Sequence, residues 1–187
     1  SISRYFKQQY ELLREEKETP RYFRQRLRMN YMYKGPQLEL LAIKESHNEA
    51  VYTALNSVLP KQGHLTELGC GYGFHIYMLQ FTGWRRTLTG IDANEEMIEV
   101  AANCFSKTEQ QQFICDDPLN VTLPASQAFI INQQQLNLPA EGLSQLAATC
   151  AAQLPAGGVL VYTGSQPAIS GFTATQVHPA VFLLSTK

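Results

Sequence analysis

The spacing of apolar residues along this chain changes near residue 61. Before that point they recur every three or four positions, which is the spacing of one face of a helix. Helices are predicted around residues 5–13, from Pro20 to about residue 31, and over residues 38–59. Thr19 and Pro20 favour a start for the second helix, because threonine caps a helix and proline fits its first position. Residues 1–60 are therefore expected to form a helical N-terminal cap.

From residue 61 onward, short apolar runs alternate with helical stretches. The predicted strands are residues 64–68, 87–92, 112–115, 128–132 and 159–163, and the predicted helices are residues 74–81, 95–105 and 141–154. Such alternation indicates βαβ units that build a parallel sheet covered on both faces. Residues 61–187 are thus predicted to form an α/β domain with a doubly wound, mostly parallel, Rossmann-like sheet.

Residues 172–177 and 180–187 are predicted to add two strands at the end of the chain. The segment before them, residues 164–171, is rich in glycine, serine and proline and has little helical pattern. A missing helix leaves the sheet edge poorly covered, and such an edge is normally protected by charge or by a partner. We therefore expect a homodimer or another domain there. The abrupt helical start at Ser3 is consistent with a fused upstream domain.

The 187 residues correspond to about one domain. No stretch reaches the ~18 apolar residues that a transmembrane helix needs, so no transmembrane segment is expected. The four cysteines show no CxxC spacing, which argues against a zinc site and against a disulfide framework. This cysteine usage fits a reducing compartment, and we expect a cytoplasmic protein without a metal.

The net charge of -1 conceals an uneven distribution of charge. Residues 1–34 hold nine of the fifteen Lys and Arg residues but only four of the sixteen Asp and Glu residues. This basic, aromatic segment is interpreted either as a lid over the sheet domain or as the entry for an acidic, lipid-like or carrier-linked acceptor. Nucleic acid is an unlikely partner, since the rest of the chain is acidic and continues no basic track.

The most informative stretch is residues 65–74, in which a predicted strand runs into three glycines at alternate positions and then into a helix. Glycine permits a tight turn and lets a ligand lie against the main chain. A dinucleotide site requires G-x-G-x-x-G, with its third glycine where Phe74 stands. Here the spacing is G-x-G-x-G, and Glu67 lies two residues before the first glycine. A carboxylate there suits a cationic ligand and repels a pyrophosphate.

This motif resembles that of the class I S-adenosylmethionine-dependent methyltransferases. The resemblance covers about residues 60–165 and implies S-adenosyl-L-methionine as cofactor, with S-adenosyl-L-homocysteine as product. It implies that the acid and the loop hold the amino-acid end of the cofactor, through Glu67, Gly69, Cys70, Gly71 and Gly73. Cys70 is expected to fill space in this loop rather than to act as a nucleophile.

The resemblance continues at the ends of the next two predicted strands. Asp92, followed by Ala93, closes the second strand, where an acid can accept hydrogen bonds from both ribose hydroxyls. Met97 follows five residues after that acid and is expected to pack its thioether against the adenine. The third strand ends in two acids, of which one would accept from the adenine amino group. By register this role falls on Asp117, with Asp116 as the alternative.

The acceptor side departs from the family pattern. Asn132 ends the fourth predicted strand and can orient an acceptor through its amide oxygen. Three glutamines follow, and this stretch contains no His, Tyr or acid that could act as a base. A polar loop without a catalytic role is the alternative for this stretch. Tyr33 of the cap is a second candidate catalytic residue, whereas His75 is expected to pack or to cap a helix.

Three functions remain in competition. The first is methyl transfer to a small-molecule or to an acidic, lipid-linked acceptor, which needs no base when the acceptor is already ionised and held in line. The second is a methyltransferase-like domain that binds the cofactor or a partner without turnover. An NAD-linked oxidoreductase is the third, and both Glu67 and the glycine spacing disfavour it.

Overall fold

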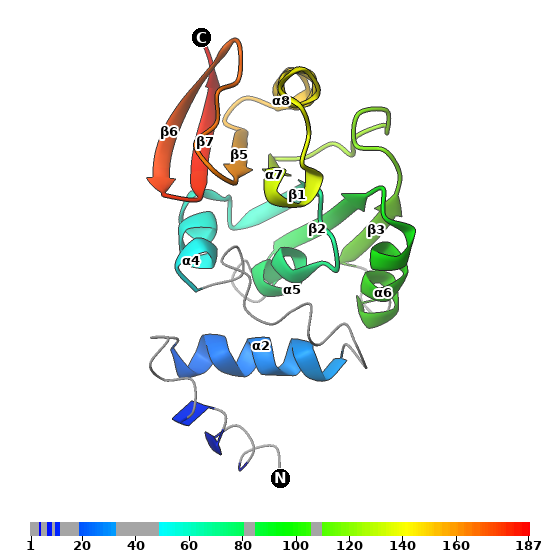
Figure 1. Ribbon diagram of the computed structural model, residues 1–187, viewed down its shortest axis with the longest axis vertical. Coiled ribbons are helices and arrows are strands. Elements are labelled where there is room, and N and C mark those ends of the chain that lie inside the picture. The colour runs from blue at the N-terminus through cyan, green and yellow to red at the C-terminus, as the bar shows by residue number, and fades with distance from the viewer. Residues whose placement is uncertain are drawn as a thin grey trace.

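The computed structural model describes residues 4, 7, 8, 10, 11, 19–32, 49–80, 85–105 and 110–187. These residues form a seven-stranded sheet with helices packed on both faces (Figure 1). The predicted α/β, Rossmann-like architecture is therefore confirmed.

The strands occur in the order β3-β2-β1-β4-β5-β7-β6 across the sheet. Strands β1 to β5 run parallel to one another, and β7 is antiparallel to both β5 and β6. Their bounds are β1 Gln62–Leu68, β2 Arg85–Asp92, β3 Gln111–Cys115, β4 Ala128–Asn132, β5 Val159–Thr163, β6 Phe172–His178 and β7 Val181–Thr186. All seven predicted strands are present.

The described residues include six helices with defined bounds, four of which cover the two faces of the sheet. Their bounds are α2 Pro20–Met32, α4 Glu49–Val58, α5 Phe74–Gln80, α6 Glu95–Phe105, α7 Gln133–Leu136 and α8 Ala140–Gln153. One face is covered by α4, α5 and α6, and the other by α8 together with the loop between β3 and β4. This arrangement on both faces is what alternating strands and helices predict.

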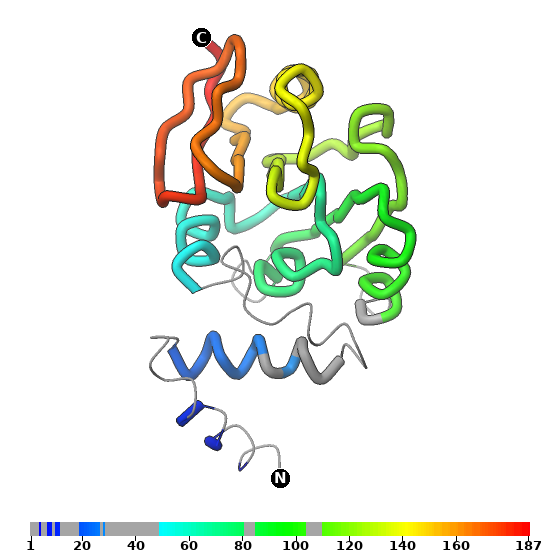
Figure 2. Tube along the Cα trace, in the orientation of Figure 1, coloured from blue at the N-terminus to red at the C-terminus, as the bar shows by residue number. Residues whose placement is uncertain are grey.

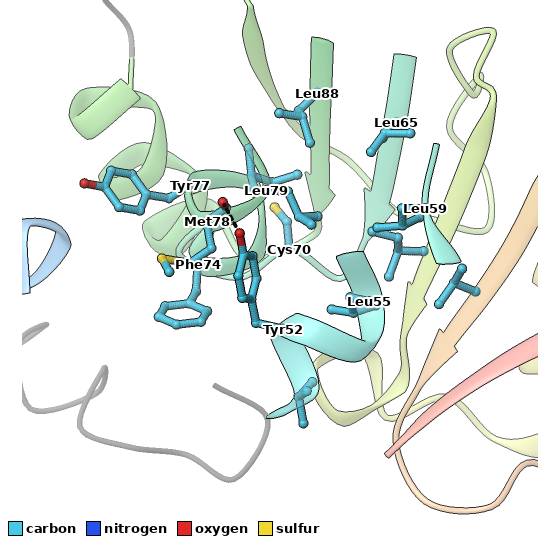
Figure 3. Close-up of a cluster of buried hydrophobic side chains, with 14 of the residues drawn as sticks. Tyr52, Leu55, Leu59, Leu65, Cys70, Phe74, Tyr77, Met78, Leu79 and Leu88 are labelled. Carbon is cyan, nitrogen blue, oxygen red and sulfur yellow. Dashed lines mark hydrogen bonds between the residues drawn. The ribbon is translucent and has the colours of Figure 1, made fainter. Parts of the chain in front are cut away.

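The core between α4, α5 and the sheet is continuous and apolar (Figure 3). Leu55, Leu65 and Leu79 are fully buried there. The hydroxyl of Tyr52 in this cluster is satisfied, since Tyr52 Oη donates to the carbonyl oxygen of Met78 at 3.3 Å. This packing fixes α5, the helix that follows the glycine loop, against β1 and β2.

The strand order reverses between β1 and β4. From β1 the chain moves outward to β2 and β3, and it then returns to place β4 on the other side of β1. In open α/β sheets, ligands bind at such a reversal, at the carboxyl ends of the strands. The glycine loop after β1 and the short helix α7 after β4 both lie at this point.

Helix α2 begins at Pro20, as predicted. The backbone N–H of Tyr22 donates to Thr19 Oγ1 at 3.3 Å, so Thr19 caps the helix. Glu49, at the start of α4, accepts from both the backbone N–H and the hydroxyl of Thr19 at 2.6 Å. The Glu49 carboxylate therefore connects the start of α2 to α4, which packs on the sheet. The part of the predicted third helix before α4 lies outside the described residues.

The end of the chain forms the β6–β7 hairpin, and α4 contacts both of its strands (Figure 2). Residues 164–171, all described, contain no helix, as their composition predicts. Strand β6 lies at the edge of the sheet. None of the helices in the described part of the chain has both the length and the apolar character needed to cross a membrane.

Candidate functional site

The loop between β1 and α5 requires its glycines. Gly69, Gly71 and Gly73 have φ angles of +82°, +53° and +83°, which side chains other than hydrogen rarely permit. A Cβ on Gly69 would also lie 2.9 Å from the carbonyl oxygen of Asn132. The loop therefore turns tightly and lies directly against the end of β4.

The backbone N–H groups of this loop are used inside the protein. Gly69 and Cys70 both donate to the carbonyl oxygen of Ile91, at 2.8 Å and 3.2 Å. Gly73 donates to the carbonyl oxygen of Cys70 at 2.9 Å. A dinucleotide loop presents such groups to an anionic pyrophosphate. In this loop the same N–H groups donate to carbonyl oxygens of β2 and of the loop itself, so they are not available to bind a phosphate.

Asp92, at the end of β2, connects the loop to the next turn. Its Oδ2 accepts from the backbone N–H of Gly71 at 2.9 Å, and its Oδ1 accepts from that of Asn94 at 2.9 Å. The residue is 6% exposed. Each oxygen keeps a second lone pair for a ligand hydroxyl. The carboxylate can therefore orient the loop and still accept hydrogen bonds from a ligand.

Glu67 lies beneath the loop and is paired with a histidine. His75 Nδ1, in the first turn of α5, donates to Glu67 Oε2 at 2.6 Å, and the two side chains are 2% and 1% exposed. The second oxygen, Oε1, is buried and has no hydrogen-bond partner in the described part of the chain. A buried carboxylate oxygen of this kind attracts a cationic donor. The sequence did not indicate this pairing of His75 with Glu67.

Cys70 packs against β2 at Gly90. Its sulfur lies 2.7 Å from where a Cβ of Gly90 would stand, so the absence of a side chain at Gly90 makes room for it. Burial raises the pKa of the Cys70 thiol well above its usual value, and the charges of Glu67 and Asp92 raise it further. A thiol held protonated in this way is a poor nucleophile.

Met97 lies on the first turn of α6. Gln135 Nε2 of α7 donates to Met97 Sδ at 3.2 Å. Ala93, between Asp92 and this helix, is exposed, and its carbonyl oxygen accepts from the Cys115 thiol at 3.8 Å. The structure thus brings the predicted residues of β2 and α6 to the same edge of the sheet as the loop.

The two acids after β3 are used differently. Asp117 Oδ1 accepts from the backbone N–H of Leu119 at 3.0 Å, and its Oδ2 accepts from Asn120 Nδ2 at 2.6 Å. Both Asp117 oxygens therefore close the turn that follows β3. Asp116 Oδ1 accepts from the backbone N–H of Asp117 at 2.7 Å. The Asp116 backbone N–H donates to the carbonyl oxygen of Asp92 at 3.1 Å, which places Asp116 beside the end of β2.

Asn132 ends β4 and caps α7. Its Oδ1 accepts from the backbone N–H of Gln135 at 3.4 Å, and the residue is 7% exposed. In the parallel pairing of β4 and β5, Asn132 stands next to Thr163, so the two side chains share one face of the sheet. Thr163 Oγ1 is buried and lacks a hydrogen-bond partner among the described residues. Thr163 was not predicted as a site residue.

Tyr33, the other predicted catalytic residue, lies outside the described residues. Within the described ranges, no three His, Cys, Asp or Glu side chains gather closely enough to hold a metal ion.

The family model described as "Methyltransferase domain" matches residues 66–158, which contain the loop, β2, β3, β4, α7 and α8. One curated relative, "Putative methyltransferase Rv1506c" of Mycobacterium tuberculosis, is 39% identical over 51 residues. That match covers 27% of this chain and only 31% of the relative's length.

Solved structures with the same fold include two methyltransferases. The human N-acetylserotonin methyltransferase in complex with SAM has a TM-score of 0.60 and 13% identity, over 85% of this chain and 58% of the human chain. The TehB-like SAM-dependent methyltransferase of Corynebacterium glutamicum has a TM-score of 0.57 and 13% identity, over 73% of this chain and 86% of its own. At such identities the likeness establishes the fold.

Proposed function

We propose, from the premise that this chain carries a class I S-adenosylmethionine-dependent methyltransferase domain, that it binds S-adenosyl-L-methionine and transfers its methyl group to a small-molecule acceptor. The observation that carries this proposal is the glycine loop, whose N–H groups are engaged internally while Glu67 and Asp92 frame it. Two carboxylates beside a main chain without side chains suit a cofactor that carries a positively charged ammonium and sulfonium and the hydroxyls of a ribose.

The residues present fit that cofactor. Glu67 Oε1 is buried without a partner in the described part of the chain and would accept from the cofactor's ammonium. Asp92 would accept from the ribose hydroxyls, and Met97 would pack on the adenine. We assign the contact with the adenine amino group to Asp116, because its backbone N–H donates to the carbonyl oxygen of Asp92 and so places it beside the proposed ribose ligand, whereas the Asp117 carboxylate closes the turn after β3.

S-adenosyl-L-methionine, when bound, supplies a methyl group on an electrophilic sulfonium. The task of the chain is then to hold an acceptor in line and to exclude water. Asn132 and Thr163 lie side by side at the carboxyl ends of β4 and β5 and are proposed to face that acceptor. The N-acetylserotonin methyltransferase is named for a small-molecule acceptor, which supports the same class here.

Residues 1–60 are proposed to act as the cap over the sheet domain, with Tyr33 as a residue that reaches the acceptor. An acidic or lipid-linked acceptor is the variant that the basic segment favours, since Arg21 and Arg24 of α2 are exposed. Because β6 is an edge strand of the sheet, a second copy or a further domain that covers this edge is part of the proposal.

Calorimetric titration tests the cofactor. S-adenosyl-L-homocysteine should bind in a 1:1 complex, whereas NADH should not bind. NADH binding without S-adenosyl-L-homocysteine binding would support the oxidoreductase instead. Radiolabelled methyl transfer to a panel of small phenols, amines and carboxylic acids then tests the reaction itself.

A second candidate, a domain that binds the cofactor without turnover, is favoured by one observation. The segment after Asn132 is Gln133-Gln134-Gln135-Leu136, which offers no group able to remove a proton. Tight binding of S-adenosyl-L-homocysteine with no transfer to any acceptor in the panel would support this candidate over the enzyme.

A further inference from the structure

The side chain of Gln135 contacts both the glycine loop and α6. A Cβ on Gly71 would stand 3.3 Å from both Cδ and Oε1 of Gln135, so the carboxamide rests directly on the bare main chain. Its Nε2 donates to Met97 Sδ at 3.2 Å. One side chain from α7 therefore bridges the two residues that line opposite walls of the proposed cofactor groove.

This position has a steric consequence. Gly71 and Met97 would contact different parts of the same cofactor, and a carboxamide in contact with both stands in the space between them. Two molecules cannot occupy that space at once. We propose that Gln135 closes the cofactor groove in the ligand-free protein and that S-adenosyl-L-methionine enters by displacing this side chain. The inference rests on the proposed function of the site.

The displacement can be confined to the Gln135 side chain, because the backbone of α7 is held independently. Gln133 Nε2 donates to the carbonyl oxygen of Leu138 at 2.8 Å, and the Leu138 backbone N–H donates to Gln133 Oε1 at 3.2 Å. Asn137, in the left-handed conformation, closes the helix by donating to the carbonyl oxygen of Gln133. Among the described residues, the carboxamide is held by a weak N–H···S hydrogen bond to Met97 and by van der Waals contact with Gly71.

The same residue connects the cofactor groove with the acceptor side. The backbone N–H of Gln135 donates to Oδ1 of Asn132, the residue proposed to face the acceptor. The side chain and the main chain of one residue thus contact both halves of the site. Removing the Gln135 side chain should open the cofactor site and leave the hydrogen bond between its backbone N–H and Asn132 in place.

The experiment compares Gln135→Ala with Gln134→Ala by calorimetric titration of S-adenosyl-L-homocysteine. Gln134 is the exposed neighbour on the same short helix and serves as the matched control. A ligand that binds only the open state has its affinity reduced by the closed fraction. Loss of one weak hydrogen bond should therefore lower the dissociation constant of Gln135→Ala by roughly two- to tenfold, and leave that of Gln134→Ala unchanged.

The outcomes separate the inference from the function on which it rests. Unchanged or weaker binding by Gln135→Ala, with normal binding by the wild type and by Gln134→Ala, overturns the closing role. It would instead make the carboxamide irrelevant or a direct cofactor contact. Absence of binding by all three proteins overturns the proposed function itself.

Discussion

The carboxylate oxygen Oδ2 of Asp92 accepts a hydrogen bond from the backbone N–H of Gly71 at 2.9 Å, although the two residues are 21 positions apart in the chain. This contact joins the end of β2 to the middle of the glycine loop. Asp92 is therefore both a support of the loop and a proposed ligand of the ribose, and substitution of Asp92 should affect the two roles together.

Asp92→Asn should weaken binding of S-adenosyl-L-homocysteine by about 1–3 kcal/mol, because an amide nitrogen cannot accept the hydrogen bonds that the lost oxygen accepted. Calorimetric titration measures this change. Glu95→Gln is the control, since Glu95 is an exposed acid three residues further along and should leave affinity unaltered. Equal affinities for wild type and Asp92→Asn would remove Asp92 from the cofactor site.

The two acids after β3 should separate stability from binding. Asp117→Ala removes both acceptors of the turn and should lower the free energy of unfolding by about 1 kcal/mol, with little effect on affinity for S-adenosyl-L-homocysteine. Asp116→Ala should do the reverse. Urea denaturation measures the free energy of unfolding of both variants, and calorimetric titration measures their affinity for S-adenosyl-L-homocysteine. The opposite pattern would assign the adenine contact to Asp117.

Much of the fold follows from the sequence. The predicted bounds of β4, β5 and α6 agree with the structure at both ends. Strands β4 and β5 are short apolar runs between turn residues, because they are buried on both faces of the sheet. Helix α6 is bounded by Asn94, which caps it through Met97 N–H at 3.0 Å. Burial of a short strand and capping of a helix depend on residues that are close together in the sequence, so the local residue pattern can predict these elements.

The finer geometry of the site was not predictable in this way. Helix α7 occupies a stretch for which a polar loop is the alternative in the sequence, because four residues are too few to show a helical period. The caps at Asn132 and Asn137 close this helix. The pairing of Glu67 with His75 depends on the distance from strand to helix across the loop. Whether Asp116 or Asp117 is free depends on a turn closed by side chains. These features arise from tertiary contacts, and no periodic pattern of residues in the sequence indicates them.

Loss of the histidine partner of Glu67 should be costly. His75→Ala leaves a carboxylate buried without its donor and should lower the free energy of unfolding by about 2–4 kcal/mol. Glu67→Gln keeps an acceptor oxygen for His75 and should cost less, while it weakens S-adenosyl-L-homocysteine binding by about tenfold through loss of the charge. Chemical denaturation and calorimetry separate the two effects. An unfolding free energy for His75→Ala equal to that of the wild type would contradict the pairing.

Stability should decline in alkaline solution because of a buried thiol. Burial raises the pKa of Cys150 from 9.0 to about 12, so the folded protein keeps this proton after the unfolded chain has lost it. The stabilising contribution is complete below about pH 9 and is lost as the pH rises toward 12, at about 1.4 kcal/mol per pH unit. Urea denaturation in reducing buffer should show a shallower decline for Cys150→Ala. The buried thiol of Cys70 contributes in the same direction.

Two buried threonines should respond in opposite ways to the same substitution. Thr163 Oγ1 has no partner in the described part of the chain, so Thr163→Val removes a desolvated hydroxyl and should raise the free energy of unfolding by about 1 kcal/mol. Thr66 Oγ1 is 2.8 Å from Ser126 Oγ, so Thr66→Val breaks a buried hydrogen bond and should lower it by about 1 kcal/mol. A stabilised Thr163→Val that binds S-adenosyl-L-homocysteine normally would mean that the hydroxyl is kept at a cost to folding, as expected of a group that faces an acceptor. A destabilised Thr163→Val would show instead that the hydroxyl supports the fold.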